Sequence, residues 1–210
     1  MQDLDGRVAV VTGGASGIGR SLAGRLTVEG MHVVLADIEE GALRDAVAGI
    51  GGDAVGFTTD VTSMVAVEAL AEFAYDTFGA VHVLCNNAGV FQGGLMWECS
   101  DADFEWTLGV NVMGIVHGVR AFVPRMLAAG TEGHVVNTVS MAGLATTPFS
   151  GPYDVSKFAA MAATECLAHD LASVGAAIRV SAPRRMARQP SSWAGVGSPK
   201  RLSHQRRRTG

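Results

Sequence analysis

The stretch that decides the fold is Val8-Ala9-Val10-Val11-Thr12-Gly13-Gly14-Ala15-Ser16-Gly17-Ile18-Gly19. Its four apolar residues predict a buried strand, and the helical spacing that begins at Ile18 predicts a helix. The glycines therefore lie between the C-terminal end of a strand and the N-terminus of a helix. Phosphate oxygens can approach a backbone that has no Cβ, and the free N–H groups of the helix favour negative charge. A glycine-rich run alone also forms ordinary tight turns, so its place between strand and helix carries the argument.

Short apolar runs and helical spacing alternate along the rest of the chain, which is typical of βαβ units and a parallel sheet. Several runs are apolar on both faces, as buried parallel strands are. Right-handed crossovers place helices on both faces, so we expect a Rossmann-like, doubly wound α/β fold of three layers. The predicted strands are residues 7–11, 32–36, 54–57, 81–85, 134–138 and 177–180. The predicted helices are residues 18–29, 40–48, 64–78, 101–128 and 153–173, the fourth being long or broken near Gly114.

Length and composition fit one compact domain. The chain has 210 residues, 48% of them hydrophobic, and 27 glycines, which excludes disordered and fibrous classes. The N-terminus has no basic start or apolar signal core, and no run reaches the ~18 apolar residues of a membrane span. Cys85, Cys99 and Cys166 have no metal-ligand spacing, so we expect reduced thiols, Cys85 in the core and no metal site. These features predict a soluble, cytoplasmic protein that does not bind membranes.

The net charge of −4 conceals an asymmetry. Before residue 184 there are eight basic residues against all 20 acidic ones, a formal charge of −12, whereas residues 184–210 hold eight basic residues and no acid. Residues 191–210 show no strand or helix periodicity, and Arg, Ser, Gly and Pro dominate them. We therefore expect a dinucleotide-binding domain over residues 1–183 and a basic, disordered tail over residues 184–210.

An acidic residue follows the second predicted strand. Asp37 ends the run Val33-Val34-Leu35-Ala36, where a carboxylate can accept hydrogen bonds from the hydroxyls of an adenosine ribose. Neither Ser16 nor Ile38 offers a positive charge for a 2′-phosphate. The sequence therefore favours NAD over NADP.

Tyr153 and Lys157 stand four residues apart on a predicted helix, so they share a face. A free phenol titrates near about pH 10, and lowering its pKa by about three units takes roughly 4 kcal/mol. One ammonium at about 4 Å in an effective dielectric of about 20 is worth a similar amount. Ser140, just beyond a strand, could then hold a substrate oxygen while Tyr153 moves its proton and a nicotinamide exchanges the hydride.

Each of these residues has an ordinary explanation as well. A lysine follows a tyrosine at this spacing by chance about one time in twenty. Ser140 alone is more often a helix cap or a turn residue than a catalytic group. Their joint occurrence with the glycine turn and Asp37 is what favours the functional interpretation.

Three motifs together resemble the short-chain dehydrogenases/reductases over residues 5–183. They are residues 12–19, Asn86-Asn87-Ala88-Gly89, and Tyr153-x-x-x-Lys157 with Ser140 thirteen residues earlier. From the residues alone, Asn86 to Gly89 is only a turn after a strand, and Asn111 is unremarkable. The resemblance implies a catalytic set of Asn111, Ser140, Tyr153 and Lys157, with Asn111 in a proton relay through Lys157 and water. It also implies a cofactor site made by Gly13, Ser16, Gly17, Ile18, Gly19, Asp37, Asp60, Val61, Asn87, Ala88, Gly89, Tyr153 and Lys157, with Asp60 and Val61 near the adenine.

The chain departs from that family after Pro183. Family members continue with a Pro-Gly turn, a substrate lid and a last strand, so we expect six strands with the terminal seventh missing. A truncated or frame-shifted end explains the abrupt change of composition better than nucleic-acid binding does, because Trp193 is the tail's only aromatic residue. Two functions stay open: an NAD-dependent oxidoreductase, and a catalytically impaired dinucleotide-binding remnant that lacks a complete substrate pocket.

The substrate and the assembly are less constrained by the sequence. Several apolar side chains flank the expected site, which favours an apolar secondary alcohol or ketone, although each of them could equally be core. The resemblance implies pairing through the long helices near residues 101–128 and 153–173, so we expect a homodimer rather than a tetramer. The flanking residues are Phe91, Met96, Trp97, Leu144, Pro148 and Phe149.

Overall fold

Six parallel strands form the central sheet of the computed structural model, which describes residues 3–185. The order is β3-β2-β1-β4-β5-β7. The chain moves outward from β1 to β3 and then returns beside β1 with β4, so ligands of such a sheet bind at the C-terminal ends of β1 and β4. This confirms the Rossmann-like, doubly wound sheet. The strands are β1 (Val8–Thr12), β2 (His32–Asp37), β3 (Ala54–Thr58), β4 (Val83–Asn86), β5 (Gly133–Asn137) and β7 (Ile178–Ser181).

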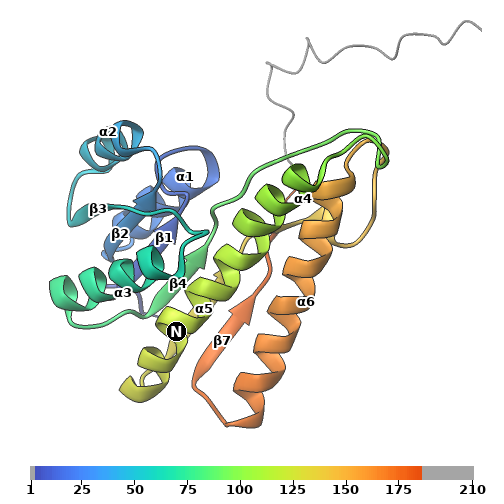
Figure 1. The fold of residues 1–210 in the computed structure, drawn as a ribbon. Helices are drawn as coiled ribbons and strands as arrows, with labels where there is room; N and C mark the ends of the chain where they lie inside the picture. Colours follow the sequence, from blue (N-terminus) through green and yellow to red (C-terminus); the bar gives the residue numbers. More distant parts are fainter. Residues whose placement is uncertain (1–2, 186–210) are drawn as a thin grey trace, which may run out of the picture.

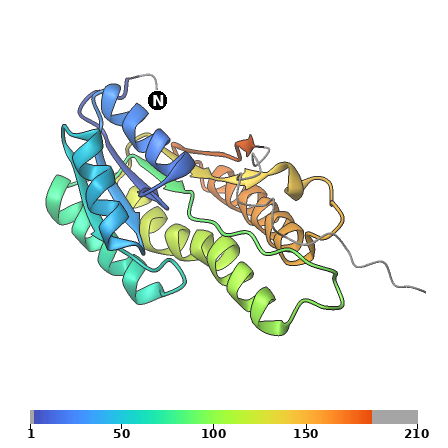
Figure 2. The ribbon, with the colours of Figure 1, turned by 90° about the horizontal axis from the view of Figure 1, so that it is seen from above.

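Helices cover both faces of the sheet and complete the three layers. Alternate strand residues point to opposite faces. Val11 and Val33 therefore pack in one apolar cluster with α1 and α2, while Val10 and Val34 pack in the other with α3, α5 and α6. Figure 1 shows α5 and α6 side by side, and Figure 2 shows both along one side of the strands. The helices are α1 (Gly17–Val28), α2 (Glu40–Ile50), α3 (Met64–Phe78), α5 (Gly114–Ala129) and α6 (Gly151–Ser173).

The long helix predicted over residues 101–128 is irregular near its middle. A capping box of Ser100 and Asp103 begins α4 (Asp101–Leu108), a π-helical turn follows over Gly109–Met113, and α5 continues from it. The predicted break near Gly114 therefore lies in the turn just before that residue, and the turn carries Asn111 inward. The run Asp101–Ala129 is long and apolar enough for a membrane span, with a mean hydropathy of 1.2, but here it packs against α3 and α6.

Two short strands lie outside the main sheet. β6 (Val139–Ser140) pairs in parallel with β8 (Arg184–Arg185), which the sequence did not predict. Regular backbone therefore extends two residues beyond Pro183. Within residues 3–185 the main sheet has the six expected strands. The rest of the expected tail, residues 186–210, lies outside the described residues, so its disorder and the missing seventh strand stay predictions.

A buried ladder of polar side chains joins the middle of the sheet to α6. Asn86 Nδ2 donates to Asn137 Oδ1 (2.9 Å), Asn137 Nδ2 donates to Thr164 Oγ1 (3.0 Å), and Thr164 donates to the Ala160 carbonyl (2.7 Å). Buried amides need such partners, because an unpaired polar group in the core is costly. Gly118 of α5 makes room for the ladder, since a Cβ there would lie 2.1 Å from Asn86 Oδ1.

We predict that Gly118→Ala destabilises the fold by about 1–3 kcal/mol, because the added methyl group overlaps a buried amide and forces a backbone shift. Gly24→Ala in α1 is the matched control, since its Cβ would meet only Ile50 at 3.8 Å and alanine favours a helix. Urea unfolding of both variants measures the difference. Equal stability of the two variants would contradict the close packing of α5 on β4.

Candidate active site

The glycine turn is closed tightly from two sides. Gly13 has φ +63°, and a Cβ there would lie 2.8 Å from Ala88 Cα. A Cβ on Gly19 would lie 2.0 Å from the Gly13 carbonyl oxygen. Both positions therefore require glycine, because any side chain would push α1 away from the turn or the turn away from the loop after β4.

The outer part of the same turn is open. Gly17 has φ +50° with nothing within 4 Å of its Cβ position, and Ser16 and Ile18 beside it are exposed. Ser16 occupies the N-cap of α1 but makes no side-chain bond to the helix. The first N–H groups of α1 are thus left without a side-chain cap beside an uncovered glycine. This arrangement fits the diphosphate of a dinucleotide.

Thr12 and Asn87 tie the glycine turn to the loop after β4. The Thr12 hydroxyl accepts the backbone N–H groups of Asn87 (3.0 Å) and Ala88 (3.1 Å). In return, Asn87 Nδ2 donates to the carbonyls of Thr12 (3.0 Å) and Gly13 (3.3 Å). These bonds join the C-terminal ends of β1 and β4, which are neighbours at the reversal of strand order.

Gly89 lies between this cradle and the predicted catalytic side chains. A Cβ on Gly89 would lie 3.3 Å from Asn111 Oδ1 and 3.5 Å from Lys157 Nζ. The loop after β4 therefore contacts the glycine turn at one end and the buried groups of the helices at the other.

Asp37 ends β2 and Asp60 follows β3, so both lie at the same edge of the sheet. The Asp37 carboxylate accepts the backbone N–H groups of Ala15 (3.0 Å) and Glu39 (3.2 Å), which fixes its orientation beside the glycine turn. Asp60 Oδ1 accepts both the N–H (2.9 Å) and the hydroxyl (2.8 Å) of Thr62. Asp37 is therefore coupled directly to the turn, whereas the Asp60 carboxylate bonds to Thr62, two residues away.

Val61 is mainly a packing residue. It is 8% exposed, and a Cβ on Gly114 would lie 3.0 Å from it. Its carbonyl lies 2.9 Å from Nδ1 of the buried His117. Val61 thus joins the loop after β3 to the start of α5.

Lys157 is a buried ammonium group beside Tyr153. It is 5% exposed, its Nζ donates to the Thr138 carbonyl (3.0 Å), and Nζ lies 5.7 Å from the centre of the Tyr153 ring. Burial lowers the pKa of Lys157 from 10.5 to about 8. Phe91 also packs on Tyr153, with ring centres 4.9 Å apart and planes tilted by 48°. The ring of Tyr153 is thus held by an aromatic neighbour and faces a positive charge.

Asn111 joins the π-helical turn to the N-terminal part of α6. Its Oδ1 accepts the Val90 N–H (2.8 Å), and its Nδ2 donates to the Val90 carbonyl (2.9 Å) and to Ser156 Oγ (2.8 Å). Ser156 in turn donates to the Tyr153 carbonyl (2.7 Å). The side chain of Asn111 therefore bonds both to the Val90 backbone and to the Ser156 hydroxyl.

Ser140 ends β6 and is 6% exposed. Its hydroxyl accepts the Ala142 N–H (3.1 Å), so it caps the short 3₁₀ turn Met141–Gly143. That turn lies against α6, because a Cβ on Gly143 would be 2.8 Å from the Lys157 carbonyl. The structure thus brings Ser140 to the helix that carries Tyr153 and Lys157, and the ordinary explanation as a cap also applies.

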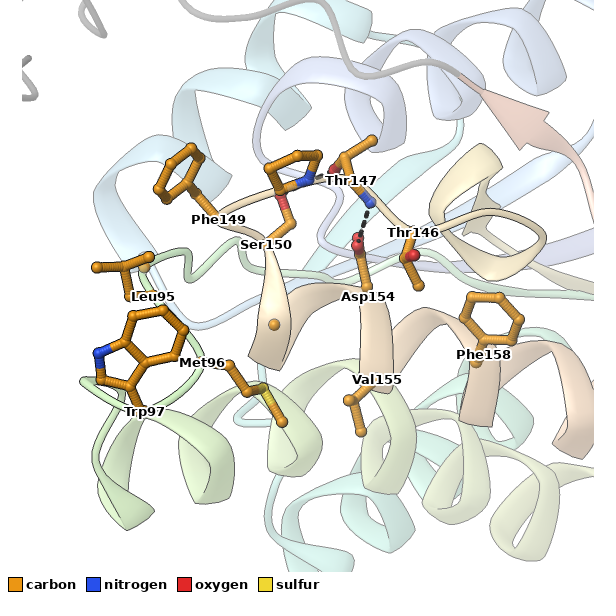
Figure 3. A pocket seen from close by; sticks show the side chains of 13 residues that line it. Leu95, Met96, Trp97, Thr146, Thr147, Phe149, Ser150, Asp154, Val155 and Phe158 are labelled. Atoms are coloured by element: carbon orange, nitrogen blue, oxygen red, sulfur yellow. Dashed lines mark hydrogen bonds between the residues drawn. The ribbon is translucent and has the colours of Figure 1, made fainter. Parts of the chain in front are cut away.

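A groove of about 720 Å³ lies on another face of α6 (Figure 3). Met96, Trp97, Pro148 and Phe149 line it together with Asp154, Val155 and Phe158, but Ser140, Tyr153 and Lys157 are not among its lining residues. Of the apolar residues expected around the substrate, Phe91 packs against the Tyr153 ring. The groove is therefore a separate feature from the proton-transfer groups.

Three residues of this network were not singled out from the sequence as site residues. Thr12, Thr138 and Ser156 each contribute a hydroxyl that bonds to a predicted site residue. Thr12 directly precedes the glycines, so its position in the sequence could have marked it as a site residue. Thr138 and Ser156 carry no pattern of their own, since threonine and serine are common and their partners lie far away in the sequence.

A family model described as short chain dehydrogenase matches residues 7–186. The chain therefore belongs to the short-chain dehydrogenase family, as its motifs predict. The crystal structure of a short chain dehydrogenase/reductase from Burkholderia phymatum in complex with NAD has a TM-score of 0.86 and 42% identity, covering 96% of this chain and 76% of that one.

Two curated relatives extend this comparison. The CLA biosynthesis dehydrogenase/reductase of Lactiplantibacillus plantarum is 35% identical over 81% of this chain and 61% of its own length. The 1-deoxy-11-beta-hydroxypentalenate dehydrogenase of Streptomyces exfoliatus is 38% identical over 87% of this chain and 68% of its own length. The chain thus spans 61% and 68% of the lengths of these two relatives and belongs to the same family.

We predict that the Lys157 ammonium titrates near pH 8, because burial disfavours its charged form. The sequence holds only two lysines, Lys157 and Lys200, so ε-¹³C-lysine labelling gives two NMR signals to follow against pH. Lys157→Arg assigns them by removing one. Titration of the Lys157 signal at the ordinary lysine value of about 10.4 would contradict the burial of this group.

Proposed function

We propose that this chain is an NAD-dependent oxidoreductase that transfers a hydride between the nicotinamide and an apolar secondary alcohol or ketone. The observation that carries the proposal is the buried Lys157 ammonium facing the Tyr153 ring, at the same sheet edge as an open glycine turn. The nicotinamide would supply the hydride chemistry when it is bound. The protein's own task is to orient the substrate and move one proton.

Tyr153 is the proposed general acid/base. A tyrosine hydroxyl can exchange a proton with the oxygen of an alcohol or ketone. Lys157 places a positive charge beside the Tyr153 ring, and Ser140 holds the substrate oxygen from the turn packed on α6. Asn111 keeps the first turn of α6 in place through Ser156 and takes part in the proton relay that the family resemblance implies.

The proposed cofactor site runs along the C-terminal edge of the sheet. The glycine turn and the start of α1 would take the diphosphate, Asp37 the adenosine ribose, Asp60 and Val61 the adenine, and Asn87 to Gly89 the side nearest the nicotinamide. The fixed carboxylate of Asp37 supports NAD, because it would repel a 2′-phosphate. The NAD complex of the Burkholderia phymatum structure supports the same choice.

An apolar substrate is supported by the surroundings of Tyr153. Phe91 contacts the tyrosine ring, and Met141 and Leu144 beside Ser140 are 44% and 45% exposed. Exposed apolar side chains close to a candidate site are typical of pockets for apolar ligands. The names of the two relatives, a CLA biosynthesis dehydrogenase/reductase and a 1-deoxy-11-beta-hydroxypentalenate dehydrogenase, are consistent with an alcohol or ketone substrate.

The proposed assembly is a homodimer in the cytoplasm. The groove, which Trp97 (79% exposed) and Phe158 (42%) line, is an apolar surface on α6 and the loop before α4, and Trp106 of α4 is also exposed (49%). Large exposed apolar surfaces usually mark interaction sites. A second copy of the chain fits this surface, because the family resemblance places the subunit contact on the same helices.

We predict that the purified chain binds NADH and, with NAD⁺ as the hydride acceptor, oxidises apolar secondary alcohols to ketones. Tyr153→Phe is expected to lower kcat by about a hundredfold to ten-thousandfold and to change NADH affinity far less. NADH fluorescence titration and turnover on a panel of such alcohols measure both quantities. Tyr75→Phe is a matched control, since Tyr75 is the only other tyrosine and lies on α3.

The same experiment separates the two functions that the sequence left open. NADH binding without turnover on any alcohol or ketone in the panel would favour the catalytically impaired remnant. Absence of NADH binding would contradict both functions. Equal turnover of the Tyr153→Phe and Tyr75→Phe variants would remove Tyr153 from its proposed role.

We predict that Asp37→Ser shifts the ratio of NADPH to NADH dissociation constants at least about tenfold toward NADPH, because it removes the charge that opposes a 2′-phosphate. Glu40→Gln, at the start of α2, removes a nearby acid that is exposed and is expected to leave the ratio within about twofold. Fluorescence titrations with both cofactors test the pair. An unchanged ratio in the Asp37→Ser variant would remove Asp37 from the selection of cofactor.

A further inference from the structure

All three polar groups of Thr138 bond to the candidate site. Its N–H donates to the Asn86 carbonyl (2.9 Å), its hydroxyl donates to Asn87 Oδ1 (3.2 Å), and its carbonyl accepts from Lys157 Nζ (3.0 Å). Thr138 stands between β5 and β6, so its backbone is also held by the strands on either side. One residue thus contacts both the end of β4 and the proposed catalytic lysine.

The hydrogen-bond partners fix the direction of each bond around Asn87. The carbonyls of Thr12 and Gly13 can only accept, so the NH₂ of Asn87 must face them. The amide oxygen of Asn87 then faces Thr138, whose hydroxyl has to be the donor. A valine at position 138 would have nearly the same shape but would leave this oxygen without that donor.

The carbonyl of Thr138 accepts a hydrogen bond from the buried Lys157 ammonium. A buried ammonium requires hydrogen-bond acceptors, because its desolvation is otherwise uncompensated. The direction of the Thr138 carbonyl is set by the bonds that the N–H and the hydroxyl of the same residue make to Asn86 and Asn87. The Tyr153 ring, 5.7 Å from Nζ, is the titratable group that faces the ammonium.

We propose that Thr138 is a positioning residue that holds the Asn87 amide against the glycine turn and aims its own carbonyl at Lys157, so that the cofactor cradle and the proton-transfer site keep one geometry. The part concerning the cofactor rests on the proposed function. The part concerning Lys157 applies to the free protein and can be measured without any cofactor.

The test compares Thr138→Val, which removes the hydroxyl, with Thr138→Ser, which keeps it. In Thr138→Val the Lys157 ε-¹³C signal is expected to titrate about half a unit lower than in the wild type, because the carbonyl is less well aimed at the charged form. The NADH dissociation constant is expected to rise about tenfold, since the Asn87 oxygen loses its donor. Thr138→Ser is expected to restore both quantities.

Thr164→Val is the matched control. It removes a buried threonine hydroxyl from the polar ladder on α6, so it is expected to lower the thermal midpoint without changing the Lys157 titration. An unchanged Lys157 titration in Thr138→Val, failure of Thr138→Ser to restore it, or the same shift in Thr164→Val would overturn the inference. If wild-type protein fails to bind NADH, the proposed function is contradicted, and the lysine titration alone decides the role of Thr138.

Discussion

The two-sided hydrogen bonding of the Asn87 amide is the interaction on which the site depends. Backbone groups that pass the end of a parallel sheet lose their ladder partners and still need hydrogen bonds. Asn87 supplies them to Thr12 and Gly13 at the end of β1, while its oxygen accepts from Thr138 at the end of β5. A single side chain therefore joins three strand ends. The inner face of the glycine turn is bonded to Asn87, while Ser16 and Gly17 on its outer face are exposed.

Close backbone contacts allow this polar network to be buried. A Cβ built on Gly19, Gly118 or Gly143 would lie only 2.0–2.8 Å from an atom of a neighbouring segment. In so dense a core, most buried amides and hydroxyls are satisfied by partners within the protein. The same dense packing removes Lys157 from solvent and lowers its pKa. The pKa of Lys157 therefore depends on the packing around it, since a looser core would expose the ammonium to water.

The sequence predicted the architecture well because strands and helices depend on local apolar patterns. The six main strands, the helices on both faces and the irregular segment before Gly114 follow from such patterns. β6 and β8 are two residues long and have no periodicity to detect. Thr138 and Ser156 escaped prediction for a different reason: their partners Asn87 and Asn111 lie 51 and 45 residues away. Whether a hydroxyl takes part in the site depends on tertiary contacts, which a local sequence pattern does not contain.

The groove and the proton-transfer groups use different faces of α6, yet one loop pair connects them. Phe149 in the groove has φ +64°, a conformation that costs a bulky residue on the order of 1–3 kcal/mol. Its carbonyl accepts the N–H of Gly94 (2.8 Å), and the loop that holds Gly94 also carries Phe91, which packs on Tyr153. Relaxation of Phe149 would therefore release the loop that supports the tyrosine ring. The strained residue of the groove is thus one hydrogen bond away from the loop whose Phe91 packs on Tyr153.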